Sequence, residues 1–159
     1  MLSIPGPAGP LEALLDRPDG PPRAAVAFAH PHPEHGGTMH TKVVFRASKA
    51  LAGIGCLVLR FNFRGVGGSA GVFDEGDGEA ADFRAALDYL AARTPGTPLW
   101  AAGMSFGSWI AMETGAVDDR VRLLLGIATP AARYDYPSTR ASGKPRDQER
   151  KAEERVLGV

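Results

Sequence analysis

One serine lies in a pentapeptide whose residue types can do chemistry. The run Gly103-Met104-Ser105-Phe106-Gly107 falls where an apolar strand is expected to end and a helix of small residues to begin. In such a nucleophile elbow the serine takes a strained backbone conformation, and the flanking glycines let strand and helix pass closely. The first amides of the helix then stabilise negative charge on a bound carbonyl oxygen. We therefore predict that Ser105 is a nucleophile rather than a simple helix cap.

Histidine is the residue type that most often takes the proton of a nucleophilic serine. The chain has four histidines, all before Ser105: His30, His32, His35 and His40. The spacing H-x-H-x-E-H from His30 is close to a zinc-binding run of metallo-β-lactamase-like hydrolases. Further zinc ligands would be needed later in the chain, where no histidine occurs, and the two prolines of the run favour a fixed turn. A zinc-dependent hydrolase is therefore a lesser alternative, and we expect neither metal nor cofactor.

A glycine-rich run over residues 65–71 follows an expected strand and invites a dinucleotide-binding interpretation. Its spacing is G-x-G-x-x-x-G, and residues 72–78 do not open a helix whose amides could hold a pyrophosphate. We therefore predict no nucleotide cofactor.

The elements that would position these residues alternate between strand and helix. Apolar runs typical of buried strands cover residues 24–29, 56–63, 99–103 and 121–127, and helical periodicity covers residues 39–54, 79–93 and 106–114. A hairpin with a Pro/Gly turn is expected over residues 2–15. This alternation is typical of right-handed parallel crossovers. The predicted fold class is α/β, with a mostly parallel sheet and helices on both of its faces.

Composition and charge limit the class of protein further. A content of 44% hydrophobic and 23% charged residues fits one globular domain, which we place at residues 1–145. Basic and acidic residues both number 18, so no net field would attract nucleic acid or an anionic membrane surface. The single cysteine, Cys56, lies in an apolar run and is expected in the core. Without a secretory signal or an apolar span, a cytoplasmic location is expected.

Several motifs, in the same order, resemble a bacterial group of small α/β-hydrolases related to dienelactone hydrolases and serine aminopeptidase-like proteins. The matching segments, which cover residues 1–145, include Ala29-His30-Pro31-His32-Pro33, Gly36-Gly37-Thr38-Met39, Leu59-Arg60-Phe61-Asn62-Phe63-Arg64-Gly65-Val66-Gly67 and the elbow. The resemblance implies an esterase- or peptidase-like serine hydrolase. Its substrate would be a small molecule with an ester or amide bond, attacked by Ser105 and released by hydrolysis of the acyl-enzyme.

The resemblance also implies roles for residues around the serine. The loop after the first long strand would supply one oxyanion-hole amide, and His32 is the candidate because the adjacent prolines have no N–H. The amide of Phe106 would be the second donor. The turn that begins at Arg64 resembles an R-G-x-G turn that lines the same cleft. The residues expected to support the elbow and the cleft are Gly103, Gly107, His30, Arg64 and Gly65.

The family pattern fails in the last part of the chain. In this fold the order along the chain is serine, acid, histidine, yet no histidine follows Ser105. Eight of the ten residues 146–155 are charged, so we expect a charged tail over residues 146–159 that is frayed or helical. The last strands of the sheet would be missing or altered. A truncated or frame-shifted product is our hypothesis for this change.

Two consequences follow from the missing acid and histidine. First, catalytic competence is in question, and the competing interpretation is a non-catalytic hydrolase-like binding protein or a remnant. A triad built from His30 or His32 with Asp135 or Asp147 would be unusual. Second, the loss of the last strands would expose an apolar sheet edge, which favours a homo-oligomer through that edge.

Overall fold

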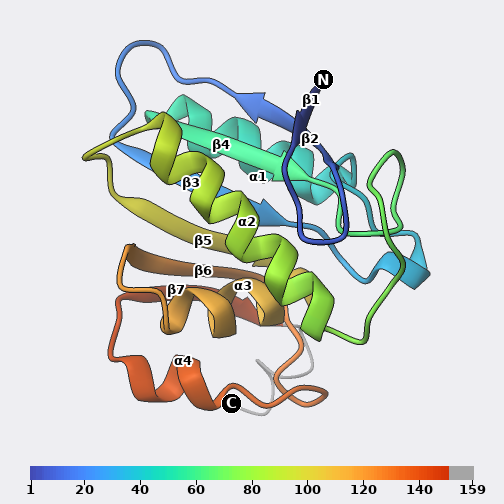
Figure 1. Cartoon of the computed structure of the whole chain (residues 1–159). Helices are drawn as coiled ribbons and strands as arrows, with labels where there is room; N and C mark the ends of the chain where they lie inside the picture. Colours follow the sequence, from blue (N-terminus) through green and yellow to red (C-terminus); the bar gives the residue numbers. More distant parts are fainter. Residues whose placement is uncertain (151–159) are drawn as a thin grey trace.

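The computed structural model describes residues 1–150, and one seven-stranded sheet runs through them (Figure 1). Its order is β1-β2-β4-β3-β5-β6-β7. The strands are β1 Leu2–Ile4, β2 Leu11–Asp16, β3 Ala24–Ala29, β4 Cys56–Phe61, β5 Leu99–Met104, β6 Val121–Thr129 and β7 Arg146–Arg150. Strands β3 to β7 are parallel to their neighbours, whereas the β1–β2 hairpin joins β4 in antiparallel pairing.

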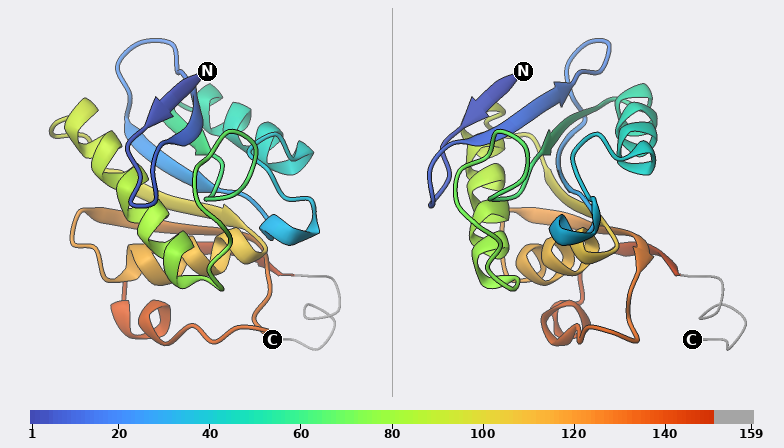
Figure 2. Two further views of the ribbon diagram at one scale, coloured as in Figure 1. Left: turned by 45° about the vertical axis from the view of Figure 1, so that its right-hand side comes forward. Right: turned by 90° about the vertical axis from the view of Figure 1, so that its right-hand side faces the viewer.

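Helices cover both faces of this sheet, which confirms the predicted α/β class. They are α1 Lys42–Gly53, α2 Asp77–Arg93, α3 Phe106–Ala116 and the short α4 Pro137–Ser142, with a 3-10 turn at Pro33–His35. Helix α1 packs on one face, and α2 and α3 pack on the other (Figures 1 and 2). No helix of the described residues is both long and apolar enough to cross a membrane.

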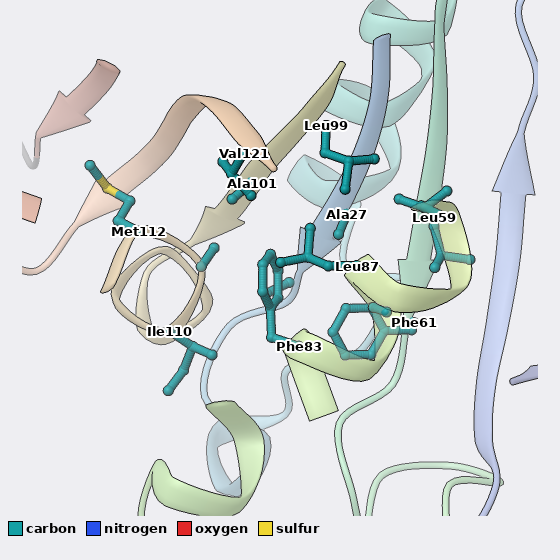
Figure 3. Close-up of a cluster of buried hydrophobic side chains, with 14 of the residues drawn as sticks. Ala27, Leu59, Phe61, Phe83, Leu87, Leu99, Ala101, Ile110, Met112 and Val121 are labelled. Atoms are coloured by element: carbon teal, nitrogen blue, oxygen red, sulfur yellow. The ribbon is translucent and has the colours of Figure 1, made fainter. Parts of the chain in front are cut away.

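The face under α2 and α3 holds the larger part of the core. Phe83 and Leu87 of α2 lie against Leu59 and Phe61 of β4 and Ala27 of β3, and these side chains are fully buried (Figure 3). Strand β3 is buried along its whole length, as its continuous apolar run predicts. Packing on both faces holds β3 in place, and the histidine-rich loop begins at its carboxyl end.

The opposite face is covered by α1 over the middle of the sheet only. Val26 and Val58 are buried beneath this helix, together with the thiol of Cys56. Beside α1 an apolar groove of about 350 Å³ stays open, with Leu51 and Ile54 on its helix side and Leu125 on its sheet side. This face is therefore less completely covered than the other one.

The charged segment after residue 145 differs from the expected frayed or helical tail. Residues 146–150 form β7, which pairs in parallel with β6 at the edge of the sheet. A charged strand is stable there because an edge lets its side chains reach water, as exposed Arg146 and Asp147 do, while β6 satisfies its backbone. The predicted apolar edge is thus wrong, since β7 covers β6. The rest of the expected tail, 151–159, lies outside the described residues.

Candidate active site

Ser105 stands in a strained turn between β5 and α3. Its φ of 52° and ψ of −122° are rare for a residue with a side chain. A Cβ on Gly103 would collide with the backbone of Gly107, and a Cβ on Gly107 would collide with the carbonyl of His30. The Ser105 N–H donates to the carbonyl of Ile127 on β6 at 2.8 Å. The backbone thus has the conformation that the sequence predicts for a nucleophile elbow.

Three other loops meet the elbow at the same edge of the sheet. Because β3, β4, β5 and β6 are parallel, the segments that leave their carboxyl ends lie side by side. The histidine-rich loop follows β3, the glycine-rich loop 62–76 follows β4, and residues 130–136 follow β6. The topology therefore gathers residues that are far apart in the sequence around a half-buried Ser105.

Two backbone amides are candidates to receive a bound oxygen. Phe106 is the first residue of α3, so its N–H has no acceptor within the helix. The carbonyl of His32 accepts the N–H groups of His35 and Gly37 at 3.0 and 3.1 Å, which folds the loop back on itself. The described residues supply no hydrogen-bond acceptor for the N–H of either Phe106 or His32. The rings of these two residues lie with centroids 4.9 Å apart.

The ring of His30 connects two backbone segments through hydrogen bonds. It is fully buried, its Nε2 accepts the N–H of Phe63 at 3.0 Å, and its Nδ1–H donates to the carbonyl of Pro31 at 2.7 Å. Burial lowers the pKa of His30 to about 4, so the ring is neutral at neutral pH. Both ring nitrogens are engaged by backbone groups, so this histidine ties the loop after β3 to the end of β4 and is not poised as a base or a zinc ligand.

His32 is half-buried, and its hydrogen bond fixes the tautomer. Its Nδ1 accepts the N–H of Glu34 at 3.1 Å, so the proton of the neutral ring is on Nε2. Burial is the main cause that lowers the pKa of His32. The ring stacks on His35 with centroids 4.2 Å apart. In this arrangement Nε2 is a donor, so His32 is not set to accept the proton of Ser105.

The predicted Arg64–Gly65 turn is held from α2. The Arg64 guanidinium pairs with both oxygens of Asp82, at 3.1 and 2.9 Å, and the Arg64 N–H donates to the same carboxylate. Asp82 is fully buried, and its hydrogen bond raises the pKa of Arg64. Gly65 has a φ of 76° and makes the turn possible. Arg64 therefore stabilises the wall of the site through Asp82.

A buried polar network behind the glycine-rich loop was not anticipated from the sequence. Asn62 accepts the N–H of Met39 at 2.8 Å and donates to Glu12 at 3.0 Å. The Glu12 carboxylate also accepts the N–H of Gly68 at 2.6 Å. These bonds lower the pKa of Glu12, the Gly68 bond most. The Glu12 carboxylate thus ties the glycine-rich loop to β2.

The structure also collects aromatic rings beside Ser105. Phe106 lies at their centre, and ring centroids lie 4.3 to 6.2 Å apart within a set that we call the aromatic cluster: His32, Phe73, Phe106, Trp109 and Tyr134. Phe106 is buried, whereas the other four keep part of their surface exposed. Phe73, Trp109 and Tyr134 are not among the site residues that the sequence predicts.

The two aspartates weighed as substitutes for the triad acid are engaged in other contacts or lie on another face. Asp135 is exposed and pairs with Arg140 at 2.8 Å, which holds the pKa of Asp135 below its usual value. Asp147 is on β7 and lines the groove on the α1 face. Among residues 1–150 no cluster of three or more His, Cys, Asp or Glu side chains could hold a metal ion. The described geometry thus favours neither the stand-in triad nor the zinc alternative.

A mostly parallel sheet, helices on both faces and a strained serine after β5 together define the class: the chain has an α/β-hydrolase fold. Comparison with known proteins narrows the class to a family. Residues 20–144 match the family described as "Serine aminopeptidase, S33", and the chain belongs to that family.

Bacterial relatives support this assignment. The uncharacterized protein RP471 of Rickettsia prowazekii is 41% identical over 135 residues, and the chain spans 57% of its length. XC6422 of Xanthomonas campestris, a serine hydrolase described as lacking a lid, has 39% identity and a TM-score of 0.83 over 92% of this chain and 69% of its own. A serine hydrolase homologue of Coxiella burnetii has 38% identity and a TM-score of 0.83, over 92% and 71% of the respective chains.

Proposed function

We propose that this chain carries the nucleophile and the oxyanion hole of a serine hydrolase that acts on ester or amide bonds. The observation that carries the proposal is the backbone of Ser105, whose positive φ is accommodated by two glycines that cannot bear a Cβ. Strain of this kind persists where the surrounding structure enforces it, and it presents the side chain at the edge of the sheet. The substrate is a small molecule with an acyl group.

The reaction begins with attack of the Ser105 oxygen on the carbonyl carbon. The carbonyl π electrons move to its oxygen, which becomes an oxyanion, and the serine proton passes to a base. The amides of Phe106 and His32, which have no other acceptor among the described residues, donate to that oxyanion. When this intermediate collapses, the bond to the leaving group breaks, and that group takes the proton from the base and departs as the alcohol or amine. Water, which gives a proton to the same base, then attacks the acyl-enzyme, and the acid is released as the proton returns to Ser105.

We infer that the base is not one of the four histidines. His40 is exposed at the start of the α1 segment, and His35 is an exposed partner in the stack on His32. His30 is engaged at both nitrogens, and the Nδ1 bond of His32 leaves its proton on Nε2. In the family pattern the acid and the histidine come after the position of β7, and the chain spans 57% of RP471 and 69% of XC6422. Residues 1–150 therefore supply the nucleophile and the two amides of the proposed site, and the base is not among their histidines.

Labelling with a fluorophosphonate in the presence of added imidazole tests this proposal. Imidazole is a neutral base that can replace a missing histidine. We expect slow labelling of Ser105 that accelerates in proportion to the imidazole concentration and is absent in Ser105→Ala. Ser138→Ala is a matched control, since Ser138 is also half-buried at the start of a helix. Labelling of this variant should equal that of the unmodified chain.

The second candidate is a non-catalytic binding protein with a hydrolase fold, favoured by the lack of any histidine after Ser105. If Ser105 stays unlabelled at every imidazole concentration, or reacts no faster than Ser138, the nucleophile assignment is wrong and the binding protein is the better interpretation.

A further inference from the structure

We propose that the aromatic cluster binds a planar aromatic group in the acyl part of the substrate. The inference rests on the proposed function in that it takes Ser105 as the point of attack. It goes further by naming the chemical class of the acyl group, namely benzoyl- or cinnamoyl-like rather than branched or saturated.

The position of the rings follows from the topology. His32 comes from the loop after β3, Phe73 from the loop after β4, and Phe106 is the neighbour of Ser105. Tyr134 comes from the segment after β6, and Trp109 lies one turn along α3, where its N–H donates to the carbonyl of Ser105 at 3.3 Å. Four separate segments thus each bring a ring to the edge at which Ser105 is presented.

These rings differ from the aromatic residues of the core. Phe61, Phe63 and Phe83 are completely buried, and their only role is packing. His32, Phe73, Trp109 and Tyr134 each remain partly exposed although they contact one another or Phe106. Exposed ring surface is unfavourable in water, so a contiguous set of it next to a nucleophile indicates a surface for an apolar, flat ligand.

The ring of Trp109 is fixed before any ligand arrives. It stacks on Tyr134 with centroids 4.3 Å apart and planes 7° apart, and its Nε1–H donates to the carbonyl of Asp135 at 3.1 Å. A Cβ on Gly76 would lie 2.8 Å from the indole, so the glycine leaves room for it. A hollow of about 360 Å³ borders the same indole on the side of Gly76 and Ile110, and Trp109 is the one ring of the cluster that lines it. Preorganised rings lose little conformational freedom on binding, which favours affinity.

A positive charge near the aromatic cluster limits which probes can be compared. The Arg133 guanidinium lies 5.8 Å from the centroid of Tyr134 and contributes to the lowered pKa of His32. It would attract any carboxylate. Probes must therefore carry the same charge and differ only in the shape of the apolar part. Trans-cinnamate and 3-cyclohexylpropanoate meet this condition, because both are nine-carbon acids but only the first is planar and aromatic.

The test is a titration followed by the indole N–H signals of the two tryptophans in NMR spectra. Trp109 reports on the aromatic cluster, whereas Trp100 packs on the α1 face, on the other side of the sheet. The variant Trp100→Phe assigns the two signals. We expect cinnamate to shift the Trp109 signal and to bind about threefold to tenfold more tightly than 3-cyclohexylpropanoate, the range measured for contacts between aromatic rings.

Variants refine the result. Phe73→Leu and Tyr134→Leu should each reduce the preference for cinnamate while the affinity for 3-cyclohexylpropanoate stays within about twofold. Phe45→Leu is the matched control, because Phe45 is an exposed ring on α1, away from the cluster. It should leave both affinities unchanged. Equal affinities for the two acids in the unmodified chain, or a response of Trp100 in place of Trp109, would overturn the inference even if a variant failed to fold.

The outcome is separable from that of the proposed function. If Ser105 is not labelled but Trp109 responds selectively to cinnamate, the aromatic subsite stands as a binding site and only the chemistry is wrong. If Ser105 is labelled and the two acids bind equally, the nucleophile stands and the subsite is wrong.

Discussion

The sheet face under α2 and α3, which lie on the side opposite α1 (Figure 2), is closed by packed side chains, whereas the α1 face keeps an open apolar groove. On the closed face Phe83 and Leu87 are fully buried. On the α1 face Leu51 is only half-buried, and Ile54 is 57% exposed although both line the groove. Parallel strands with apolar side chains on both faces need cover on both, so the difference makes the α1 face the less completely covered of the two.

The candidate active site depends on the closed face. Phe106, which follows Ser105, is 2% exposed and packs into the same core as Phe83. His30 also packs on this face, since the centroid of its ring lies 4.8 Å from that of Phe63. The elbow, the two candidate amides and the aromatic cluster are therefore supported by packing that is complete within the described residues. We expect substitutions on the two faces to differ accordingly.

The largest contrast should come from truncation of one large side chain on each face. Phe83→Ala removes a ring from a closed core, where such changes cost about 3–5 kcal/mol. Leu51→Ala removes atoms that are already partly in water, and we expect a loss of only about 1 kcal/mol. Urea denaturation of both variants measures the two free energies of unfolding. Equal losses would mean that the groove is covered in solution, and the contrast between the faces would be lost.

The pH dependence of stability tests the closed face at His30. The pKa of His30 is about 4 in the folded chain and about 6.5 in the unfolded chain, where the ring is in water. Between these values the unfolded state binds more protons, so stability is fully present above pH 6.5 and is lost as the pH falls toward 4. The loss is on the order of 3 kcal/mol.

The variant His30→Gln isolates this contribution. A glutamine oxygen can accept the Phe63 N–H as Nε2 does but does not titrate. We expect the variant to be less stable than the unmodified chain at pH 7 and to change less between pH 7 and pH 4. His40→Gln is the control, because His40 is exposed. If His30→Gln retained the full pH dependence, the titrating group would have to be sought elsewhere.

The sequence predicts the closed face and the elbow better than the edge of the sheet. Strand β3 begins and ends at the same residues as its apolar run. Gly103 and Gly107 predict the bend at Ser105. Both predictions succeed because they depend on neighbouring residues alone. Residues 146–150 were misjudged since a charged strand is stable only at an edge, and whether a segment lies at an edge is a property of the whole sheet. The residue types of the segment itself do not show whether it will lie at the edge of the sheet.

The aromatic cluster was missed for a related reason. Phe73 and Tyr134 are 61 positions apart in the numbering and carry no motif, and only the parallel order of β4, β5 and β6 brings them to Phe106. The Glu12–Asn62 bond likewise joins distant segments. Phe73, Phe106 and Tyr134 do follow β4, β5 and β6 in turn, but this pattern indicates a site only when the strand order is known.

The smallest expected effect is on the α1 face, at Gly53. A Cβ there would meet nothing within 4 Å, and the residue is exposed at the end of α1 beside the groove. Gly53→Ala should therefore stabilise the chain by about 0.5 kcal/mol, because alanine loses less backbone entropy in a helix. Gly96 is the matched control, since it has equal space but a φ of +79°. Gly96→Ala should destabilise by about 1 kcal/mol, because an L residue is strained in that conformation. Thermal unfolding of both variants gives the two signs, and a loss at Gly53 as large as that at Gly96 would show that another surface packs against this end of α1.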